Sequence, residues 1–252
     1  MRKVSIITVC FNSAKTILKC IDSVNAQEYS NIEHIFIDGG SSDDTLQKIH
    51  ENAKRKPKII SEPDDGIYDA MNKGLYLASG ELIMFLNSDD SFADPNALKL
   101  ALCRVDNNHL VIFSAISYQI HRRNLVWKPT MPNKLKILFG WNAPHPGFIA
   151  NTKYLREAGG FDTSIRITAD IDLIIRCVLK LLNTPNAIKV NTEVLTIMDP
   201  TGESSKLSSM ISGNLDFKKI CEKNKILTPW FIYIIFRILP KIHRKLKLFS
   251  VK

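Results

Sequence analysis

The sequence has few cysteines, and none of them are close neighbours. Its five cysteines are spread over 252 residues without a C-x-x-C pair that could bind zinc or cycle through a disulfide. This pattern excludes a disulfide scaffold and favours a reducing compartment. The 11 glycines have no period, which excludes a collagen-like chain, and a hydrophobic content of 45% excludes disorder. The length fits one α/β domain or two small ones.

The sequence also lacks a clear targeting or membrane-spanning segment. Met1-Arg2-Lys3 and the apolar run up to Cys10 resemble the start of a signal peptide, but the run is short and no small-residue cleavage site follows it. We therefore predict that residues 4–9 form a buried strand. A second apolar stretch, residues 227–239, is interrupted by Arg237 and falls short of the ~20 residues that a spanning helix needs.

Positive charge is concentrated at one end of the chain. The formal net charge is +9, but residues 213–252 hold ten Lys/Arg and two Asp/Glu, or +8, which leaves +1 for residues 1–212. The apolar, aromatic stretch 227–239 followed by the basic stretch 240–247 predicts a helix lying in the interface of an anionic membrane. The alternative is a C-terminal helix that packs on the domain with a solvated basic end.

Strands and helices alternate in the first hundred residues. Apolar runs of strand length and segments with apolar residues at helical spacing predict the order strand 4–9, helix 14–24, strand 32–37, a helix opened by residues 41–44, strand 58–61, helix 67–78 and strand 81–86. Ser41 with Asp44 fits a capping box. This order predicts a Rossmann-like α/β fold with a mainly parallel central sheet flanked by helices. Residues 110–127 predict a mixed β extension of the same sheet, and residues 169–182 and the last forty residues predict helices.

Acidic residues follow three of the predicted strands. Asp38 comes after the second strand, Asp64-Asp65 after the third and Asp89-Asp90 after the fourth. Ligands of an open parallel sheet bind beyond the carboxyl ends of its strands, so these acids predict a shared cleft. A divalent ion carrying phosphate oxygens would relieve their mutual repulsion. The alternative is that each Asp is a turn former or helix N-cap. Neither the P-loop motif G-x-x-x-x-G-K-[ST] nor the dinucleotide-binding motif G-x-G-x-x-G follows the first strand. The metal ion is therefore the candidate for binding phosphate.

Several segments in order resemble one enzyme family. The segments VSIITVCFNS, FIDGGSSDDT, EPDDGIYDAMNKGLYLASGELIMFLNSDD, the HPGF around His145 and GGFDTSIRITADIDL together resemble the family 2 glycosyltransferases with the GT-A fold. Within this family, the sequence resembles bacterial enzymes that build surface polysaccharides. The resemblance covers roughly residues 3–200. It implies a nucleotide-binding half at residues 1–105, an acceptor half at residues 106–212 and a separate tail at residues 213–252.

The resemblance implies a donor site in the first half. Thr8 and Phe11 match positions that line the nucleotide base, and Asp38 matches the acid that bonds the base or ribose. The segment that closes over the nucleotide-sugar, expected to be a UDP-sugar, contains Asp65, Asp69, Asn72 and Lys73. Lys73 could offset diphosphate charge; the alternative is a lysine on an exposed helix face.

The resemblance also implies a metal site in Asn87-Ser88-Asp89-Asp90. Asp90 is the expected direct ligand of Mn²⁺ or Mg²⁺, and Asp89 lies nearer the sugar or ribose. Many members have Asp where this chain has Asn87, so position 87 is the weaker candidate. The ion would neutralise the leaving nucleoside diphosphate.

The second half supplies the expected base and acceptor residues. Asp170 matches the general base at the start of a helix, with Ala169 where the family often has Glu, and the alternative for Asp170 is an N-cap. Asp172 is expected to be structural. His145 and Trp141 are expected on the acceptor side, each with a structural role as the alternative. Residues 199–205 resemble a mobile segment that covers the donor, with Gly202 as a hinge.

These features predict an inverting, metal-dependent glycosyltransferase of the hexosyltransferase type. It would transfer one sugar to a saccharide hydroxyl, on a lipid-linked acceptor, at the cytoplasmic face of the cell membrane. The Q-x-x-R-W motif of processive synthases is absent after Asp172, which favours single transfers. The rival enzyme, a sugar-phosphate nucleotidyltransferase, would need a Gly-rich basic loop where this chain reads CFNSAK. The rivals outside enzymes are a nucleic-acid-binding protein or a non-catalytic membrane-associated protein that uses the basic tail.

Overall fold

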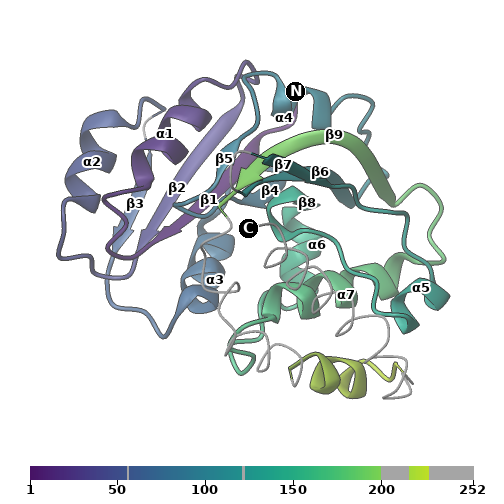
Figure 1. Cartoon of the computed structure of the whole chain (residues 1–252). Coiled ribbons are helices and arrows are strands. Elements are labelled where there is room, and N and C mark those ends of the chain that lie inside the picture. Colours follow the sequence, from purple (N-terminus) through teal and green to yellow (C-terminus); the bar gives the residue numbers. More distant parts are fainter. Residues whose placement is uncertain (56, 121–122, 200–215, 227–252) are drawn as a thin grey trace.

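The computed structural model describes residues 1–55, 57–120, 123–199 and 216–226. Nine strands form one sheet in the order β3-β2-β1-β4-β8-β6-β9-β5, with β7 paired to β6 off this path. The sheet is strongly curved in Figure 1, where β9 arches over the elements of the second half. Of the predicted tail, residues 213–252, the structure describes residues 216–226, where Phe217 is buried in the core. The rest of the tail and residues 200–205 of the predicted mobile segment, with Gly202, lie outside the described residues.

The first half alternates strands and helices as predicted. Its elements are β1 (Val4–Cys10), α1 (Ile17–Asn25), β2 (Ile32–Asp38), α2 (Thr45–Asn52), β3 (Lys58–Ser61), α3 (Ile67–Leu77) and β4 (Leu82–Phe85). Strands β3, β2, β1 and β4 are neighbours and all parallel. Every residue of β1 and β4 is buried, because helices cover both faces of a sheet built from crossover units.

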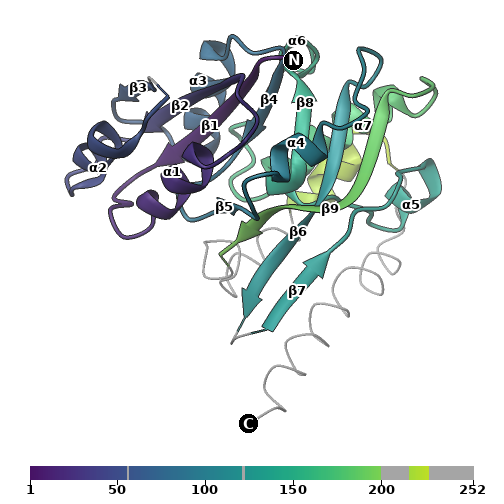
Figure 2. The ribbon, with the colours of Figure 1, turned by 90° about the horizontal axis from the view of Figure 1, so that it is seen from above.

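The second half extends this sheet with four antiparallel strand pairs and one parallel pair, which confirms the predicted mixed extension. Its elements are β5 (Ser91–Phe92), α4 (Ala97–Ala101), β6 (Val111–Ile120), β7 (Arg123–Trp127), α5 (Lys134–Leu138), the 3₁₀ turn η1 (His145–Gly147), β8 (Phe148–Asn151), α6 (Thr152–Glu157), α7 (Ala169–Leu181) and β9 (Ile188–Met198). Residues 216–223 form one more helix. Strand β8 pairs with β4 and joins the two halves. In Figure 2, the β6–β7 hairpin reaches beyond the neighbouring strands.

Apolar side chains fill both faces of the sheet. On one face α3, α6, α7 and the helix 216–223 pack against the strands, with Met71, Leu173 and Phe217 fully or almost fully buried. On the other face lie α1, α2 and α4. In α1 the four buried residues stand at positions i, i+3, i+4 and i+7, which gives the helix one apolar face. The functional side chains therefore come from strand ends and helix starts at the rim of a continuous core.

The start of α2 differs from the prediction. The helix begins at Thr45, and its N-cap Asp44 makes no side-chain cap bond. The Ser41 hydroxyl instead donates to Asp38, and Asp43 accepts the Thr45 N–H at 3.0 Å. The predicted capping box is therefore wrong, because Ser41 is used by the carboxylate that ends β2. In the described part of the chain, no helix is both long enough and apolar enough to cross a bilayer.

Candidate functional site

The turn after β4 buries a carboxylate at the rim of the sheet. The Asp90 N–H donates to the Asn87 carbonyl at 3.0 Å, which closes the turn, and Asp90 is only 2% exposed. The Oδ1 atom of Asp90 accepts the backbone N–H of Asp199, the residue after β9, at 3.2 Å. Two buried oxygens of this turn, Asp90 Oδ2 and Asn87 Oδ1, have no hydrogen-bond partner among the described residues. A buried polar atom without a partner is costly, so these oxygens indicate a place for a missing group.

The charges around this turn favour a cation. Burial raises the pKa of Asp90 well above its usual range, and the neighbouring charges of Asp89 and Asp199 raise it further. Burial and Asp199 also raise the pKa of Asp89. In the described residues, no three His, Cys, Asp or Glu side chains form a metal-binding group. The turn fits an ion such as Mg²⁺ or Mn²⁺, which takes one or two carboxylates and completes its shell with waters and phosphate oxygens.

An exposed aromatic ring lies at the end of β1. Phe11 is 62% exposed, although large apolar side chains are usually buried. A Cβ atom built on Gly39 would lie 2.6 Å from Oδ2 of Asp64 and 3.4 Å from Cδ2 of Phe11. Phe11, Gly39 and Asp64 therefore meet at the carboxyl ends of β1, β2 and β3. An open ring beside backbone and carboxylate oxygens could stack on a base.

Asp65 lies in the loop that precedes α3, and Lys73 lies in α3 itself and reaches back to this loop. The Lys73 ammonium lies 2.9 Å from Glu62 and 3.4 Å from Asp69, and it donates to the Pro63 carbonyl at 3.1 Å. The hydrogen bond with Glu62 raises the pKa of Lys73. Asp65 is exposed, and its N–H donates to Asp69 at 3.3 Å. Lys73 thus fastens the loop, and the Asp65 side chain is open to a ligand.

Asp38 is buried and already saturated with hydrogen bonds. Its oxygens accept from Gly40 N (3.2 Å), Ser41 N (2.9 Å), the Ser61 hydroxyl (2.7 Å), the Ser41 hydroxyl and the Cys10 thiol (3.7 Å). A carboxylate offers about four lone-pair sites. A nucleotide would therefore have to displace one of these donors, so the role of Asp38 toward the base stays a prediction.

Thr8 lies outside the candidate site. It is fully buried within β1, and its hydroxyl bonds Nε2 of His34 at 2.9 Å and contacts the Cys20 thiol at 3.7 Å. The expectation that Thr8 lines a base is not met, because its side chain points into the core beneath α1. Asn72 is also structural, since its amide makes two bonds to the backbone of Phe161, at 2.9 and 2.8 Å.

A second cluster surrounds Asp170 in the first turn of α7. The N-cap of this helix is Thr168, so the N-cap alternative for Asp170 is wrong. The Tyr68 hydroxyl lies 3.2 Å from Oδ1 of Asp170 and 2.7 Å from the Ile167 carbonyl. Burial and the charge of Asp170 raise the pKa of Tyr68 well above its usual range, so Tyr68 keeps its proton. Tyr68 was missed in the sequence, because nothing in helical spacing shows that a residue of α3 reaches α7.

His145 faces the same carboxylate from η1. Burial lowers the pKa of His145, and the charge of Asp170 opposes that shift, so the imidazole is neutral at physiological pH. Its buried Nε2 atom has no partner among the described residues. The rings of Tyr68, Phe161, Phe85 and His145 follow one another at 5.5, 4.9 and 6.1 Å between centroids. The two ends of this chain of rings, Tyr68 and His145, are the groups that lie near Asp170.

Trp141 has a structural environment. It is 8% exposed, its Nε1–H donates to the Thr130 carbonyl at 2.9 Å, and its ring packs edge-on against Phe113 at 5.6 Å. Both the polar and the apolar parts of the indole are thereby used inside the protein. The structure does not bring Trp141 to the cluster around Asp170, and its expected role on the acceptor side is not supported by this geometry.

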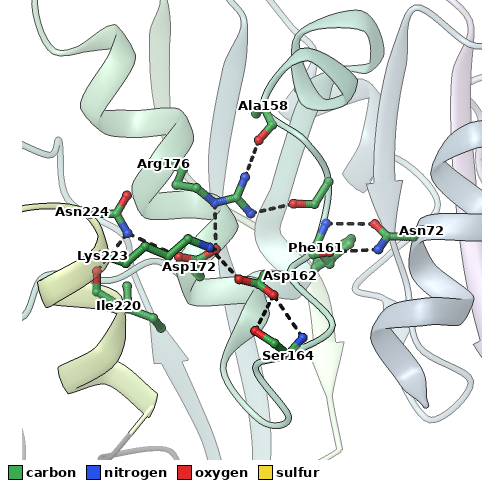
Figure 3. Close-up of polar contacts among 11 residues, drawn as sticks. Asn72, Ala158, Phe161, Asp162, Ser164, Asp172, Arg176, Ile220, Lys223 and Asn224 are labelled. Atoms are coloured by element: carbon green, nitrogen blue, oxygen red, sulfur yellow. Dashed lines mark hydrogen bonds and ion pairs between the residues drawn. The ribbon is translucent and has the colours of Figure 1, made fainter. Parts of the chain in front are cut away.

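A polar network holds the loop before α7 (Figure 3). The carboxylate of Asp172 is fully buried and accepts from Arg176 Nε at 2.7 Å. Arg176 also donates to the carbonyls of Ala158 and Gly160. From the helix 216–223, Lys223 bonds Asp162 at 2.5 Å, which lowers the pKa of Asp162 to about 2. Asp172 is thus structural, as expected, and the network ties α7, the preceding loop and the helix 216–223 together.

Comparison with known proteins agrees with this geometry. Residues 5–167 match the family model described as "Glycosyl transferase family 2". An uncharacterized glycosyltransferase of Mycobacterium tuberculosis is 33% identical over 217 residues, which covers 84% of this chain and 81% of the relative. Staphylococcus aureus TarS 1–349, solved in complex with UDP-GlcNAc, has a TM-score of 0.64 at 21% identity and covers 87% of this chain and 66% of that one. The mannosyltransferase PcManGT from Pyrobaculum calidifontis, solved with GDP-Man and Mn²⁺, has a TM-score of 0.66 at 15% identity, with 88% and 64% covered.

Proposed function

The chain belongs to glycosyl transferase family 2 and is a glycosyltransferase with the GT-A fold, and from this premise we propose that it is an inverting, metal-dependent enzyme that transfers one sugar per acceptor. The donor is a UDP-sugar, and the acceptor is a hydroxyl of a lipid-linked saccharide used for surface polysaccharide. The observation that carries the proposal is the buried Asp90 carboxylate, which has one unpartnered oxygen beside that of Asn87.

The donor end of the site is the rim formed by Phe11, Asp64, Asp65 and the turn 87–90 after β4, which we call the acidic turn. Asp90, with Asp89 beside it, would hold Mn²⁺ or Mg²⁺, and Phe11 would stack on the base. A bound divalent ion supplies positive charge to the diphosphate oxygens as the glycosidic bond breaks. The two structural neighbours support this assignment, since one was solved with UDP-GlcNAc and the other with GDP-Man and Mn²⁺.

Asp170 acts at the acceptor end as the general base. It takes the proton of the acceptor hydroxyl while that oxygen attacks the anomeric carbon and the bond to the diphosphate oxygen breaks on the opposite face. Tyr68 can serve both charge states of Asp170. Its single proton donates to the carboxylate before transfer; afterwards the protonated acid can donate to the Tyr68 oxygen while Tyr68 donates to Ile167. We assign His145 to the acceptor side, and its neutral imidazole, whose Nε2 has no partner among the described residues, supports this role.

The location proposed for the enzyme is the cytoplasmic face of the cell membrane. The basic and apolar composition of residues 227–252 supports it, since these residues combine an aromatic stretch with a cationic one. Truncation after Ile226 is expected to reduce binding to vesicles containing anionic lipid. Undiminished binding would remove the tail from this role.

Calorimetry with UDP and Mn²⁺, followed by a transfer assay, tests the reaction. We expect Asp90→Asn to lose Mn²⁺-dependent UDP binding, and Asp170→Asn to keep binding while losing transfer. Asp22→Asn, on the exposed side of α1, is the matched control and should behave as wild type. Unchanged UDP binding in Asp90→Asn would overturn the metal assignment. Salt-sensitive DNA or RNA binding that survives Asp90→Asn, without turnover, would favour a nucleic-acid-binding protein instead.

A further inference from the structure

Exposed apolar side chains are concentrated in one short part of the fold. Of the eleven large hydrophobic residues that are exposed in the described chain, five lie between positions 125 and 139: Leu125, Val126, Met131, Leu135 and Phe139. Their exposed fractions run from 37% for Phe139 to 65% for Leu135. Single exposed apolar residues are common, but a group of them marks an interaction surface.

The same part of the chain carries charge of one sign only. Between residues 107 and 156 there is no Asp or Glu, whereas seven positions are Lys or Arg. Lys128, Lys134 and Lys136 are exposed and alternate with the apolar residues. We call the surface formed by Met131, Leu135, Phe139 and these three lysines the α5 patch.

The α5 patch is held in place by local hydrogen bonds. The Asn133 side chain caps α5 by accepting the Lys136 N–H at 2.8 Å, and the Lys136 ammonium donates to the Met131 carbonyl at 2.9 Å. Ile137 is 1% exposed and anchors α5 on the core. Leu135, two positions earlier in the helix, is 65% exposed and so faces away from the core. A hollow of about 360 Å³ beside the patch is lined mainly by apolar side chains of α5, α7 and residues 224–226. The loop and the short helix therefore present their apolar groups to the outside on a fixed support.

We propose that the α5 patch lies against the surface of an anionic lipid bilayer. Apolar side chains that enter the acyl boundary, surrounded by lysines that meet lipid phosphates, match the chemistry of such an interface. A second copy of this chain is a poor occupant, because it would bring like charges together. A nucleic acid would satisfy the lysines but not the apolar side chains. The folded domain thus contributes a membrane contact of its own, in addition to any contact made by the tail.

This contact would bring the bilayer close to the acceptor end of the site. The chain runs from α5 to Trp141 and then directly into η1, where His145 faces Asp170. A lipid-linked saccharide would then need to extend only a short way from the bilayer to the base. The inference itself does not depend on which residue is the base, because it concerns binding of the protein to lipid.

The test uses the full chain and vesicles of phosphatidylcholine with or without phosphatidylglycerol. Met131→Asp/Leu135→Asp is expected to weaken binding to the anionic vesicles by at least about tenfold, since each apolar side chain contributes roughly 1 kcal/mol when half of it is buried. Lys134→Gln/Lys136→Gln should weaken it by roughly 25-fold, at about 1 kcal/mol per basic residue. Leu100→Asp is the matched control, because Leu100 is 47% exposed on α4, away from α5.

A local measurement separates the α5 patch from the tail. Hydrogen exchange of the α5 amides should slow when anionic vesicles are added, while the α4 amides should not change. Equal vesicle binding by the Met131/Leu135 variant and the Leu100 variant, with unchanged α5 exchange, would overturn the proposal. A dimer in solution that Leu135→Asp dissociates would overturn it in favour of contact between two copies. Absence of transfer by the wild-type chain, on vesicles that it binds normally, would instead count against the proposed reaction and not against the α5 patch.

Discussion

Replacing Arg176 by Met should strongly destabilise the protein, because it leaves a buried charge behind. The Asp172 carboxylate is fully buried, and Arg176 is its closest partner at 2.7 Å. Lys223 lies 3.9 Å away on a half-exposed side chain, and the Asn224 amide lies at 3.3 Å, so compensation is incomplete. Breaking a buried pair from one side costs about 3–5 kcal/mol.

Two carbonyls lose a donor in the same variant. The Gly160 carbonyl, which accepts from Arg176 at 2.6 Å, belongs to a buried residue, whereas Ala158 is half-exposed and its carbonyl can be hydrated. An unsatisfied buried acceptor costs about 1–3 kcal/mol. Since Lys223 and Asn224 still compensate part of the Asp172 charge, we expect the unfolding free energy to fall by about 4 kcal/mol in total. For a chain of this size that corresponds to a fall in Tm of roughly 8–16 °C.

Urea unfolding followed by circular dichroism measures this effect, and the chain offers a matched control. Lys153 and Glu157 have the same i, i+4 spacing, but both are exposed and 3.9 Å apart. Lys153→Met should therefore change the unfolding free energy by less than about 0.5 kcal/mol. If Arg176→Met came within about 1 kcal/mol of Lys153→Met, the claim that Asp172 needs this partner would be refuted.

Three further outcomes can be checked. Burial lowers the pKa of His34 to about 3, below the usual 6.5, so the unfolded chain binds a proton that the folded chain excludes; the unfolding free energy should fall by about 1.4 kcal/mol per unit as the pH drops below about 6. Urea midpoints between neutral and mildly acidic pH should depend less on pH in His34→Gln, and an unchanged dependence would refute this. Gly147→Ala would place a Cβ 2.3 Å from the Ser114 carbonyl and should lower stability by about 1–3 kcal/mol, whereas an unchanged Tm would show that η1 can move away freely. Tyr68→Phe removes a hydrogen bond to the Asp170 carboxylate and should lower kcat about tenfold or more without changing the KM for the donor, and a normal kcat would exclude Tyr68 from proton transfer.

Most of the first half could be predicted because its signals are local. Residues such as Ile17, Ile21 and Val24 recur at helical spacing on a face that the structure buries, and apolar runs of strand length became β1, β2 and β4. These patterns depend on which side of an element meets the core, and the sequence shows that directly. Helix ends were less accurate, as at α1, which begins at Ile17 and not at residue 14.

The candidate site was harder to predict, because its contacts join distant residues. Asp38 looked available for a ligand, but Ser61 and the Ser41 hydroxyl occupy its oxygens in the folded chain. Tyr68 meets Asp170 across 102 positions, and no periodicity reports such a meeting. The acidic turn was predicted from its place after a strand and from the family resemblance, while its unpartnered oxygens are visible only in three dimensions.

The way in which the acidic turn is held has a consequence for exchanging parts between relatives. The chain leaves β4 near the middle of the sheet and passes through the turn. It re-enters the sheet at its far edge, where β5 has β9 as its single partner strand in the described part of the chain. Asp90 receives its backbone donor from the end of β9, 109 positions later. A chimera joined near residue 105 would therefore take the turn from one parent and its support from the other. To change donor preference by recombination, β9 and Asp199 would have to come from the same parent as the first hundred residues.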